Sequence, residues 1–237
     1  MILCFKNSSM ILKYGFDRIM AFIGLLLLWP LFVVVAIFIK VKMPGPIFFT
    51  QRRVGKGGRL FNCHKFRSMR VDHGGSTVSV AGESRITPLG AKLRQYKIDE
   101  LPGLWDVLIG NMSFVGPRPD VPGYADKLRG SDRDMLKLRP GITGPASLKY
   151  RDEEEQIADF VAKVKRQDAT VVNQYKDIDF SRMTDEMIAI WYNDHVIYPD
   201  KVRLNCYYYR HYSFWKDLQM IFATILGKRI PYAGEII

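Results

Sequence analysis

The sequence has little cysteine, and its cysteines are scattered. Cys4, Cys63 and Cys206 are odd in number and form no Cys-x-x-Cys pair, which argues against a zinc ribbon or a dithiol redox motif. The histidines are equally dispersed along the chain: His64, His73, His195 and His211. We therefore expect no zinc site, and a reduced, cytosol-facing protein.

Acidic residues are also few, and no long linker divides the chain. The sequence of 237 residues has 24 Asp+Glu against 35 Lys+Arg, a formal net charge of +11. This excess predicts a polyanionic partner, which could be a membrane surface, a nucleic acid or a phosphate-bearing substrate. Because no long Ser/Gly/Pro-rich stretch is present, we expect one main domain with one additional segment.

That additional segment is a long apolar run. Residues 19–39 contain no charged side chain, and as a helix they would extend roughly 31 Å, which is enough to cross the hydrocarbon core of a bilayer. The run is too long for a signal peptide, and no small-residue cleavage site follows it. We predict that it is embedded in a membrane.

Basic residues flank this run on both sides, which is typical of the cytoplasmic side of a membrane. They precede it at Lys6, Lys13 and Arg18, and follow it at Lys40, Lys42, Arg52, Arg53, Lys56 and Arg59. A helix that enters and returns keeps both clusters inside, and Pro30 could break it at the middle. We therefore favour a re-entrant helix hairpin over a kinked single span.

A basic, aromatic segment comes next. Residues 40–71 contain nine Lys or Arg and no acid. Within them, residues 47–54 and 59–66 predict two strands around the glycine turn 55–58. Such a hairpin could bind single-stranded nucleic acid, but the neighbouring apolar run favours lipid headgroups or a phosphorylated ligand.

The acidic pair Asp99-Glu100 is the main candidate for chemistry. Thr87-Pro88 predicts a helix start before it, and a second helix is expected to begin at Asp99 and to stop at Gly110. Asp99 could simply cap that helix. It could equally be a reactive carboxylate that amide donors orient, and the local sequence leaves both readings open.

Two later loops hold arginines beside prolines or glycines: Gly116-Pro-Arg-Pro119 and Arg139-Pro-Gly-Ile-Thr-Gly144. Rigid loops of this kind suit phosphate binding, although each motif alone is weak. Further along, residues 151–165 predict a surface helix with acids in its first turn. Residues 214–226 predict a helix with a wide apolar face, which would lie either in the core or at a membrane interface.

Together these motifs resemble the bacterial sugar transferase family, the monotopic polyprenyl-phosphate phosphoglycosyl transferases. The resemblance extends from about residue 14 to residue 230. Besides the apolar run with Pro30 and the two loops above, it includes these blocks: Phe49-Thr-Gln-Arg-Arg53, Lys65-Phe-Arg-Ser-Met69, Asp99-Glu-Leu-Pro102, Asn111-Met-Ser-Phe-Val115 and Ser213-Phe-Trp-Lys-Asp-Leu218.

The resemblance implies transfer of a sugar 1-phosphate from a UDP-sugar to polyprenyl (undecaprenyl) phosphate, with release of UMP. It implies that Asp99 is the nucleophile and forms a covalent phosphosugar, with Glu100 assisting. It also implies a Mg²⁺ ion near the pair, held by Asp99. Arg118 matches the family's phosphate-binding arginine, and Lys65, Arg94 and Arg139 are further candidates in the same anion pocket.

The expected fold is α+β and mostly helical. We expect a re-entrant membrane anchor in residues 1–41, a small catalytic domain with a β-hairpin and interfacial amphipathic helices in 42–230, and a C-terminal tail in 231–237. The protein is expected in the bacterial inner membrane, with the catalytic domain on the cytoplasmic face. There it would initiate a glycan such as capsule, O-antigen or exopolysaccharide.

The expected partners are the UDP-sugar, polyprenyl phosphate and membrane lipids, and not nucleic acid; homo-oligomerisation is left open. The sequence departs from many relatives at Pro145-Ala-Ser-Leu-Lys-Tyr-Arg151, and residues 151–200 are longer than in the smallest members. The sugar is therefore left unassigned. The alternative from another class is a non-catalytic, membrane-anchored basic module that binds anionic lipid or nucleic acid.

Overall fold

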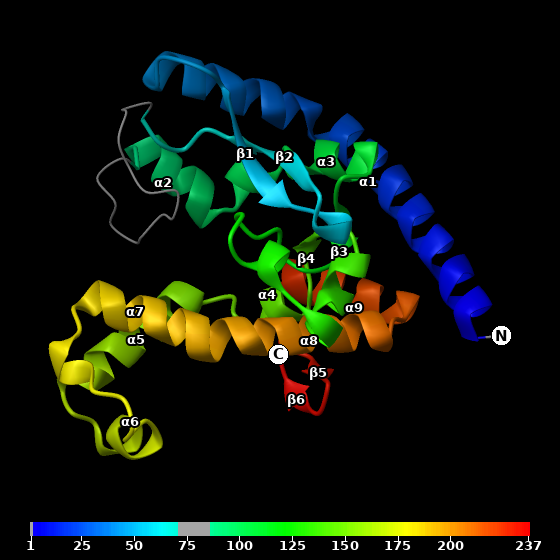
Figure 1. The fold of residues 1–237 in the computed structure, drawn as a ribbon. Helices are drawn as coiled ribbons and strands as arrows, with labels where there is room; N and C mark the ends of the chain where they lie inside the picture. The colour runs from blue at the N-terminus through cyan, green and yellow to red at the C-terminus, as the bar shows by residue number, and fades with distance from the viewer. Residues whose placement is uncertain (1, 71–85) are drawn as a thin grey trace.

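The long apolar run forms one continuous helix in the computed structural model, which describes residues 2–70 and 86–237; His73 lies outside them. This helix, α1 (Ile2–Lys42), contains Pro30 without interruption, so the break expected at Pro30 is not seen. A single proline removes one amide donor, which a helix can absorb by bending. Figure 1 shows that α1 bends along its length.

Most of α1 is exposed and apolar. Its residues 9–42 are long and apolar enough to cross a membrane, and only 11% of the most apolar stretch is buried inside the protein. Large side chains such as Leu27 (71% exposed) and Trp29 (61% exposed) point away from the domain. Such a surface is stable only against lipid or another apolar partner, so α1 is a candidate membrane helix.

The opposite face of α1 packs on the rest of the protein at points between Lys13 and Ile39. Near its start, Lys13 donates to Asp217 at 2.7 Å, with both side chains buried. Near its end, Ile39 is fully buried in a cluster that includes Phe66. In between, Gly24 approaches Leu104 so closely that a Cβ at position 24 would lie 3.4 Å from its methyl group.

The predicted β-hairpin is confirmed. β1 (Phe48–Val54) pairs antiparallel with β2 (Leu60–Phe66). Gly57 and Gly58 in the connecting turn have φ of 72° and 81°, a left-handed conformation that favours glycine. The hairpin places Lys65 near the end of β2.

The helix start at Thr87 is also confirmed, but the second helix begins later than expected. Thr87 Oγ1 accepts a hydrogen bond from the Gly90 amide at 2.9 Å and caps α2 (Pro88–Gln95). Residues Ile98–Glu100 form a 3-10 turn, and α3 runs from Gly103 to Ile109. The Leu101 amide donates to the Ile98 carbonyl at 3.2 Å, which closes the 3-10 turn, and Pro102 is the residue before the first turn of α3. Asp99 therefore lies in the turn before α3 and does not cap it.

Two short parallel strands bring the arginine loops together. β3 (Ser113–Val115) pairs with β4 (Gly141–Thr143), and the Gly116 amide donates to the Thr143 carbonyl at 2.9 Å. A Cβ at Gly116 would lie 2.3 Å from the Arg139 carbonyl oxygen. Only glycine permits this approach, so the Gly116 backbone fixes the entry to the loop that carries Arg118.

The rest of the chain is mainly helical. The remaining elements are α4 (Pro145–Lys149), α5 (Glu153–Lys165), α6 (Ala169–Gln174), α7 (Asp185–Tyr192), α8 (Tyr198–Arg210), α9 (Phe214–Leu226), β5 (Pro231–Tyr232) and β6 (Glu235–Ile236). The predicted helices at 151–165 and 214–226 are thus confirmed. Helices α5, α6 and α7 gather around Phe160 at one end of α8 (Figure 1).

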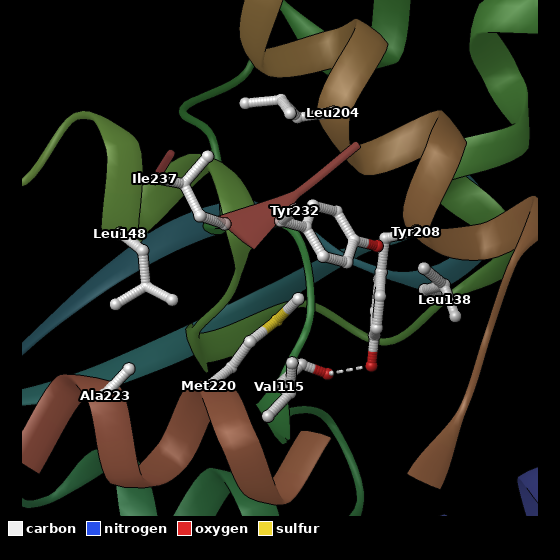
Figure 2. Close-up of a cluster of buried hydrophobic side chains, with 9 residues drawn as sticks. All are labelled: Val115, Leu138, Leu148, Leu204, Tyr208, Met220, Ala223, Tyr232 and Ile237. Atoms are coloured by element: carbon white, nitrogen blue, oxygen red, sulfur yellow. Dashed lines mark hydrogen bonds between the residues drawn. The ribbon is translucent and has the colours of Figure 1, made fainter. Parts of the chain in front are cut away.

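The main core lies between β3, α8, α9 and the C-terminal hairpin. Figure 2 shows its buried side chains, in which Tyr208 donates from its hydroxyl to the Val115 carbonyl at 3.5 Å. The expected tail, residues 231–237, contributes two members, Tyr232 and Ile237, which are 6% and 2% exposed. The end of the chain therefore helps to close this core.

α9 has two apolar faces, so both readings of this helix apply in part. Met220 and Ala223 are buried in the main core. On the other face Trp215, Phe222 and Ile225 are 77%, 59% and 73% exposed. An exposed face of this kind suits the membrane interface.

The buried ion pair between α1 and α9 should be essential for stability. Replacing Lys13 with Met leaves the Asp217 carboxylate buried without its cation, which costs about 3–5 kcal/mol in the free energy of unfolding. The exposed pair Lys163–Asp159 (2.6 Å) provides the control, because Lys163→Met should cost less than about 1 kcal/mol. Urea unfolding in detergent measures both, and equal small losses would contradict this role for Lys13.

Candidate active site

Three of the sequence-predicted site residues, Lys65, Glu100 and Arg118, line a pocket between the β-hairpin, the 3-10 turn and the two arginine loops. Asp99 adjoins it as the neighbour of Glu100 in the 3-10 turn, but neither Asp99 nor Arg94 is among its described lining residues. The pocket wall includes backbone and side chains from β2, α3 and β4. The side chains that give it its polar character are Arg53, Cys63, His64, Lys65, Glu100 and Arg118. Most of these are basic, so the pocket suits an anionic ligand.

Glu100 accepts hydrogen bonds from two of the cations. Its Oε1 accepts from Lys65 Nζ at 2.8 Å and from Arg118 Nη2 at 2.9 Å. Burial would raise the pKa of Glu100, but Arg118 and Lys65 outweigh it and lower this pKa to about 2. Glu100 therefore stays ionised and orients the two cations, and it is a weak proton acceptor near neutral pH.

Asp99 has the opposite environment. It is only 6% exposed. Burial and the neighbouring Glu100 carboxylate raise its pKa, against the opposing effects of Lys65 and Arg94. Its Oδ1 is buried and has no hydrogen-bond partner among the described residues. A poorly solvated carboxylate oxygen without a donor is more available for bond formation than one that is already hydrogen-bonded.

Arg118 and Arg94 are associated with different members of the acidic pair. The Arg118 side chain is 51% exposed, so its remaining donors can reach a ligand. Arg94 Nε donates to Ser68 Oγ at 3.2 Å, close enough to the pair to lower the pKa of Asp99. The structure thus brings Lys65, Arg94 and Arg118 around the two carboxylates.

Arg139 lies elsewhere. The centre of its guanidinium is 4.0 Å from the centroid of the Tyr14 ring, and its amide donates to the Tyr14 hydroxyl at 3.4 Å. It is not among the described residues that line the pocket, although Gly141 and Ile142 are. Its contacts are those of a residue that holds α1 against β4.

Two polar groups of the pocket were not expected from the sequence. Arg53 lines it and donates from Nη1 to the Pro119 carbonyl at 3.2 Å, which braces the Arg118 loop. His64 lines it and contacts Asp106 at 2.8 Å. The signals for Arg53 were the basic β-hairpin and the block Phe49-Thr-Gln-Arg-Arg53, although neither predicted a role in the pocket. For His64 there was none, because its partner is 42 positions away.

A magnesium ion at the acidic pair would need ligands from a substrate as well as from the protein. Within residues 2–70 and 86–237 no group of three His, Cys, Asp or Glu side chains is placed to hold a metal. Mg²⁺ is commonly held by one or two carboxylates together with substrate phosphates and water. The unpartnered Asp99 Oδ1 fits the carboxylate part of such a set.

The fold and the pocket define a protein with a candidate membrane helix and a carboxylate pair at a basic, anion-binding site. The sequence profile of the bacterial sugar transferase family matches residues 8–180. The chain belongs to this family.

Individual relatives agree with this assignment. The UDP-glucose:undecaprenyl-phosphate glucose-1-phosphate transferase of Xanthomonas campestris pv. campestris is 34% identical, covering 95% of this chain and 41% of that protein. An Aeromonas hydrophila UDP-N-acetylgalactosamine-undecaprenyl-phosphate N-acetylgalactosaminephosphotransferase is 33% identical, covering 90% and 43%. The putative undecaprenyl-phosphate N-acetylgalactosaminyl 1-phosphate transferase of Bacillus subtilis (strain 168) is 42% identical, covering 50% and 67%. The chain thus spans roughly two fifths of the first two relatives.

The low pKa of Glu100 predicts a pH-dependent contribution to stability. Because the folded-state pKa of about 2 lies below the ordinary value of 4.5, the contribution is complete above pH 4.5 and is lost as the pH falls towards 2. The stability difference between the wild type and Glu100→Gln should therefore shrink by on the order of 2–3 kcal/mol over this range. Urea unfolding at a series of pH values measures it.

The exposed Glu154 supplies the control for this measurement. Glu154→Gln should give a difference from the wild type that does not change over the same pH range. If the Glu100→Gln difference were equally flat, the ion cluster would not hold the pKa of Glu100 down.

Proposed function

We propose that the protein is a phosphoglycosyl transferase that moves a sugar 1-phosphate from a UDP-sugar to undecaprenyl phosphate and releases UMP. The observation that supports this most is the contrast within the acidic pair. Glu100 is engaged by two cations, while Asp99 has a free carboxylate oxygen beside them. The names of the relatives describe transfers of this type in Xanthomonas and Aeromonas. In this protein we propose that the step begins the assembly of a glycan.

In the first half of the reaction an Asp99 oxygen attacks the sugar-linked phosphorus. A bond from this oxygen to phosphorus forms as the bond to the bridging oxygen breaks, and the bridging oxygen leaves with the electron pair as part of UMP. Lys65 and Arg118, oriented by Glu100, bind the phosphate oxygens and offset the negative charge. The product on the protein is a phosphosugar on Asp99.

In the second half a phosphate oxygen of undecaprenyl phosphate attacks the same phosphorus. The bond to Asp99 breaks, its carboxylate is restored, and the lipid carries a diphospho-sugar. Asp99 would also hold Mg²⁺, which when bound neutralises the diphosphate and the leaving UMP. Arg94 supports the charge of Asp99 from the other side.

The packing of α1 supports a monotopic arrangement at the cytoplasmic face of the inner membrane. Lys13 near the start of α1 and Ile39 near its end both pack on the same domain. A helix that crossed the bilayer would carry one end roughly 30 Å away, on the opposite side. The bent helix can instead enter one leaflet and return, so that its exposed apolar face meets lipid and both basic flanks stay inside.

The alternative is a non-catalytic basic module that binds anionic lipid through the β-hairpin. In that case binding would depend strongly on salt and would not require Asp99. The unpartnered Asp99 oxygen and the ion cluster around Glu100 favour the transferase, because a lipid-binding surface has no use for a buried carboxylate.

Asp99 should be indispensable for turnover. Purified protein in detergent or lipid is incubated with a panel of UDP-sugars, and UMP is measured. Asp99→Asn should reduce UMP release at least ~10³-fold because the amide is not a nucleophile. With the productive UDP-sugar and no lipid acceptor, intact-protein mass spectrometry should show a phosphosugar adduct only when Asp99 is present.

The matched control is Asp177→Asn, which changes an exposed carboxylate. It should leave UMP release within about twofold of the wild type. Unchanged turnover in a folded Asp99→Asn protein would remove Asp99 from the mechanism, and absence of UMP from every UDP-sugar would overturn the proposed function.

Both ends of α1 should be accessible from the cytoplasm alone. Single cysteines at Ser8 and at Pro46, in a chain with Cys4→Ser, place one thiol on each side of the apolar run; Cys63 and Cys206 are buried. A membrane-impermeant thiol reagent should label neither site in spheroplasts and both in inverted vesicles. Labelling of the two sites from opposite sides would show a single crossing.

A further inference from the structure

One side-chain pair at the pocket has no part in the mechanism above. His64 on β2 lines the pocket, and its Nδ1 is 2.8 Å from Oδ1 of Asp106 on α3. The His64 backbone amide also donates to Asp106 Oδ2, at 2.9 Å. Both oxygens of one carboxylate therefore engage one residue and fix its position.

The partner of His64 is unusually well sequestered. Asp106 is fully buried, while the His64 side chain is 31% exposed. A carboxylate oxygen can only accept, so Nδ1 carries the proton that it shares with Asp106. The second ring nitrogen, Nε2, has no partner within the described ranges 2–70 and 86–237, and it is the ring atom that gains a proton when the imidazole becomes charged.

We propose that His64, in its protonated form, is a nucleotide-phosphate-binding residue of this pocket, and that Asp106 is its positioning residue. The inference rests on the proposed function. His64 lines the same pocket as Lys65 and Arg118, so an imidazolium there adds a third positive charge to the site. The Asp106 carboxylate, which contacts Nδ1, stabilises the positive charge of the imidazolium, as a carboxylate does for a histidine that must accept a proton. A charged imidazole binds an anionic UDP-sugar more strongly than a neutral one.

The other ionisable groups around the pocket behave differently. The pKa of Glu100 is about 2, and burial raises the pKa of the Cys63 thiol. Arg53 and Arg118 remain cations over the whole range. The Asp106 pKa is raised by burial, against its hydrogen bonds with His64.

Two carboxylates need explicit control. Asp120 lies beside the Arg118 loop, and burial raises its pKa to about 6. Its deprotonation with rising pH would also weaken anion binding. Asp99 has a raised pKa as well, so the measurement is made in protein that carries Asp99→Asn, which removes this titration and prevents turnover.

The experiment measures the Kd of the UDP-sugar that gives the most UMP with the wild-type protein. Calorimetry is run on detergent-solubilised Asp99→Asn protein from about pH 5.5 to 8.5, where an imidazole changes charge. A UDP-sugar keeps the same charge over this range, so any change in Kd reports on the protein. The Kd should rise as the pH rises.

Three additional variants separate the explanations. His64→Gln should weaken UDP-sugar binding about 10- to 100-fold near pH 5.5, because one charge-assisted hydrogen bond is lost. The same change should flatten the pH dependence of Kd. His64→Arg, whose charge is permanent, should bind at least tenfold more tightly than His64→Gln at pH 8.5. Asp120→Asn should keep the pH dependence.

Each outcome has one meaning. If a folded His64→Gln protein keeps the pH dependence of Kd, the inference is overturned and the proposed function stands. The same holds if Asp120→Asn abolishes the pH dependence and His64→Gln does not. Equal binding by the Gln and Arg variants at pH 8.5 shows that position 64 has a merely structural role. If the wild type releases UMP from no UDP-sugar, the proposed function falls and the inference falls with it.

Discussion

The site depends on one carboxylate that holds two cations. Glu100 lies in a 3-10 turn, Lys65 on a strand of the β-hairpin and Arg118 in the loop after β3, so a single oxygen connects three separate parts of the chain. A partly buried carboxylate with two cations is stable as a charged group, whereas each cation alone would repel the other. Without Glu100 the basic hairpin and the arginine loop would have no electrostatic reason to meet.

The backbone makes that meeting possible. The loop that carries Arg118 begins at Gly116, where the chain passes β4 without room for a side chain. Arg53 then holds the far end of the loop through the Pro119 carbonyl. Because prolines flank Arg118 and both ends of the loop are fixed, its guanidinium loses little conformational freedom on binding a ligand.

Local sequence signals predicted the elements better than the contacts between them. The glycine turn of the hairpin, the Thr87 cap and the Gly110 stop depend on neighbouring residues, and all three are confirmed. The break at Pro30 was not seen, because a helix can absorb the loss of one amide donor by bending. Arg139 shared a proline- and glycine-rich setting with Arg118, but its contact with Tyr14 joins residues 125 positions apart. No local pattern contains such information, and the same is true of His64 and Asp106.

Asp99 and Glu100 are both carboxylates, and their surroundings give them different chemical roles. Asp99 and Glu100 are neighbours in one turn, yet the pKa of one is raised by burial and that of the other is lowered by its cations. The engaged carboxylate is a poor nucleophile because its electron density is committed to Lys65 and Arg118. The free one is less solvated, so less water must be removed before it can form a bond. A single 3-10 turn, which points successive side chains in different directions, is enough to produce this division. The late start of α3, at Gly103, matters for the same reason, because an α-helix beginning at Asp99 would use amide donors to hold the carboxylate that must remain free.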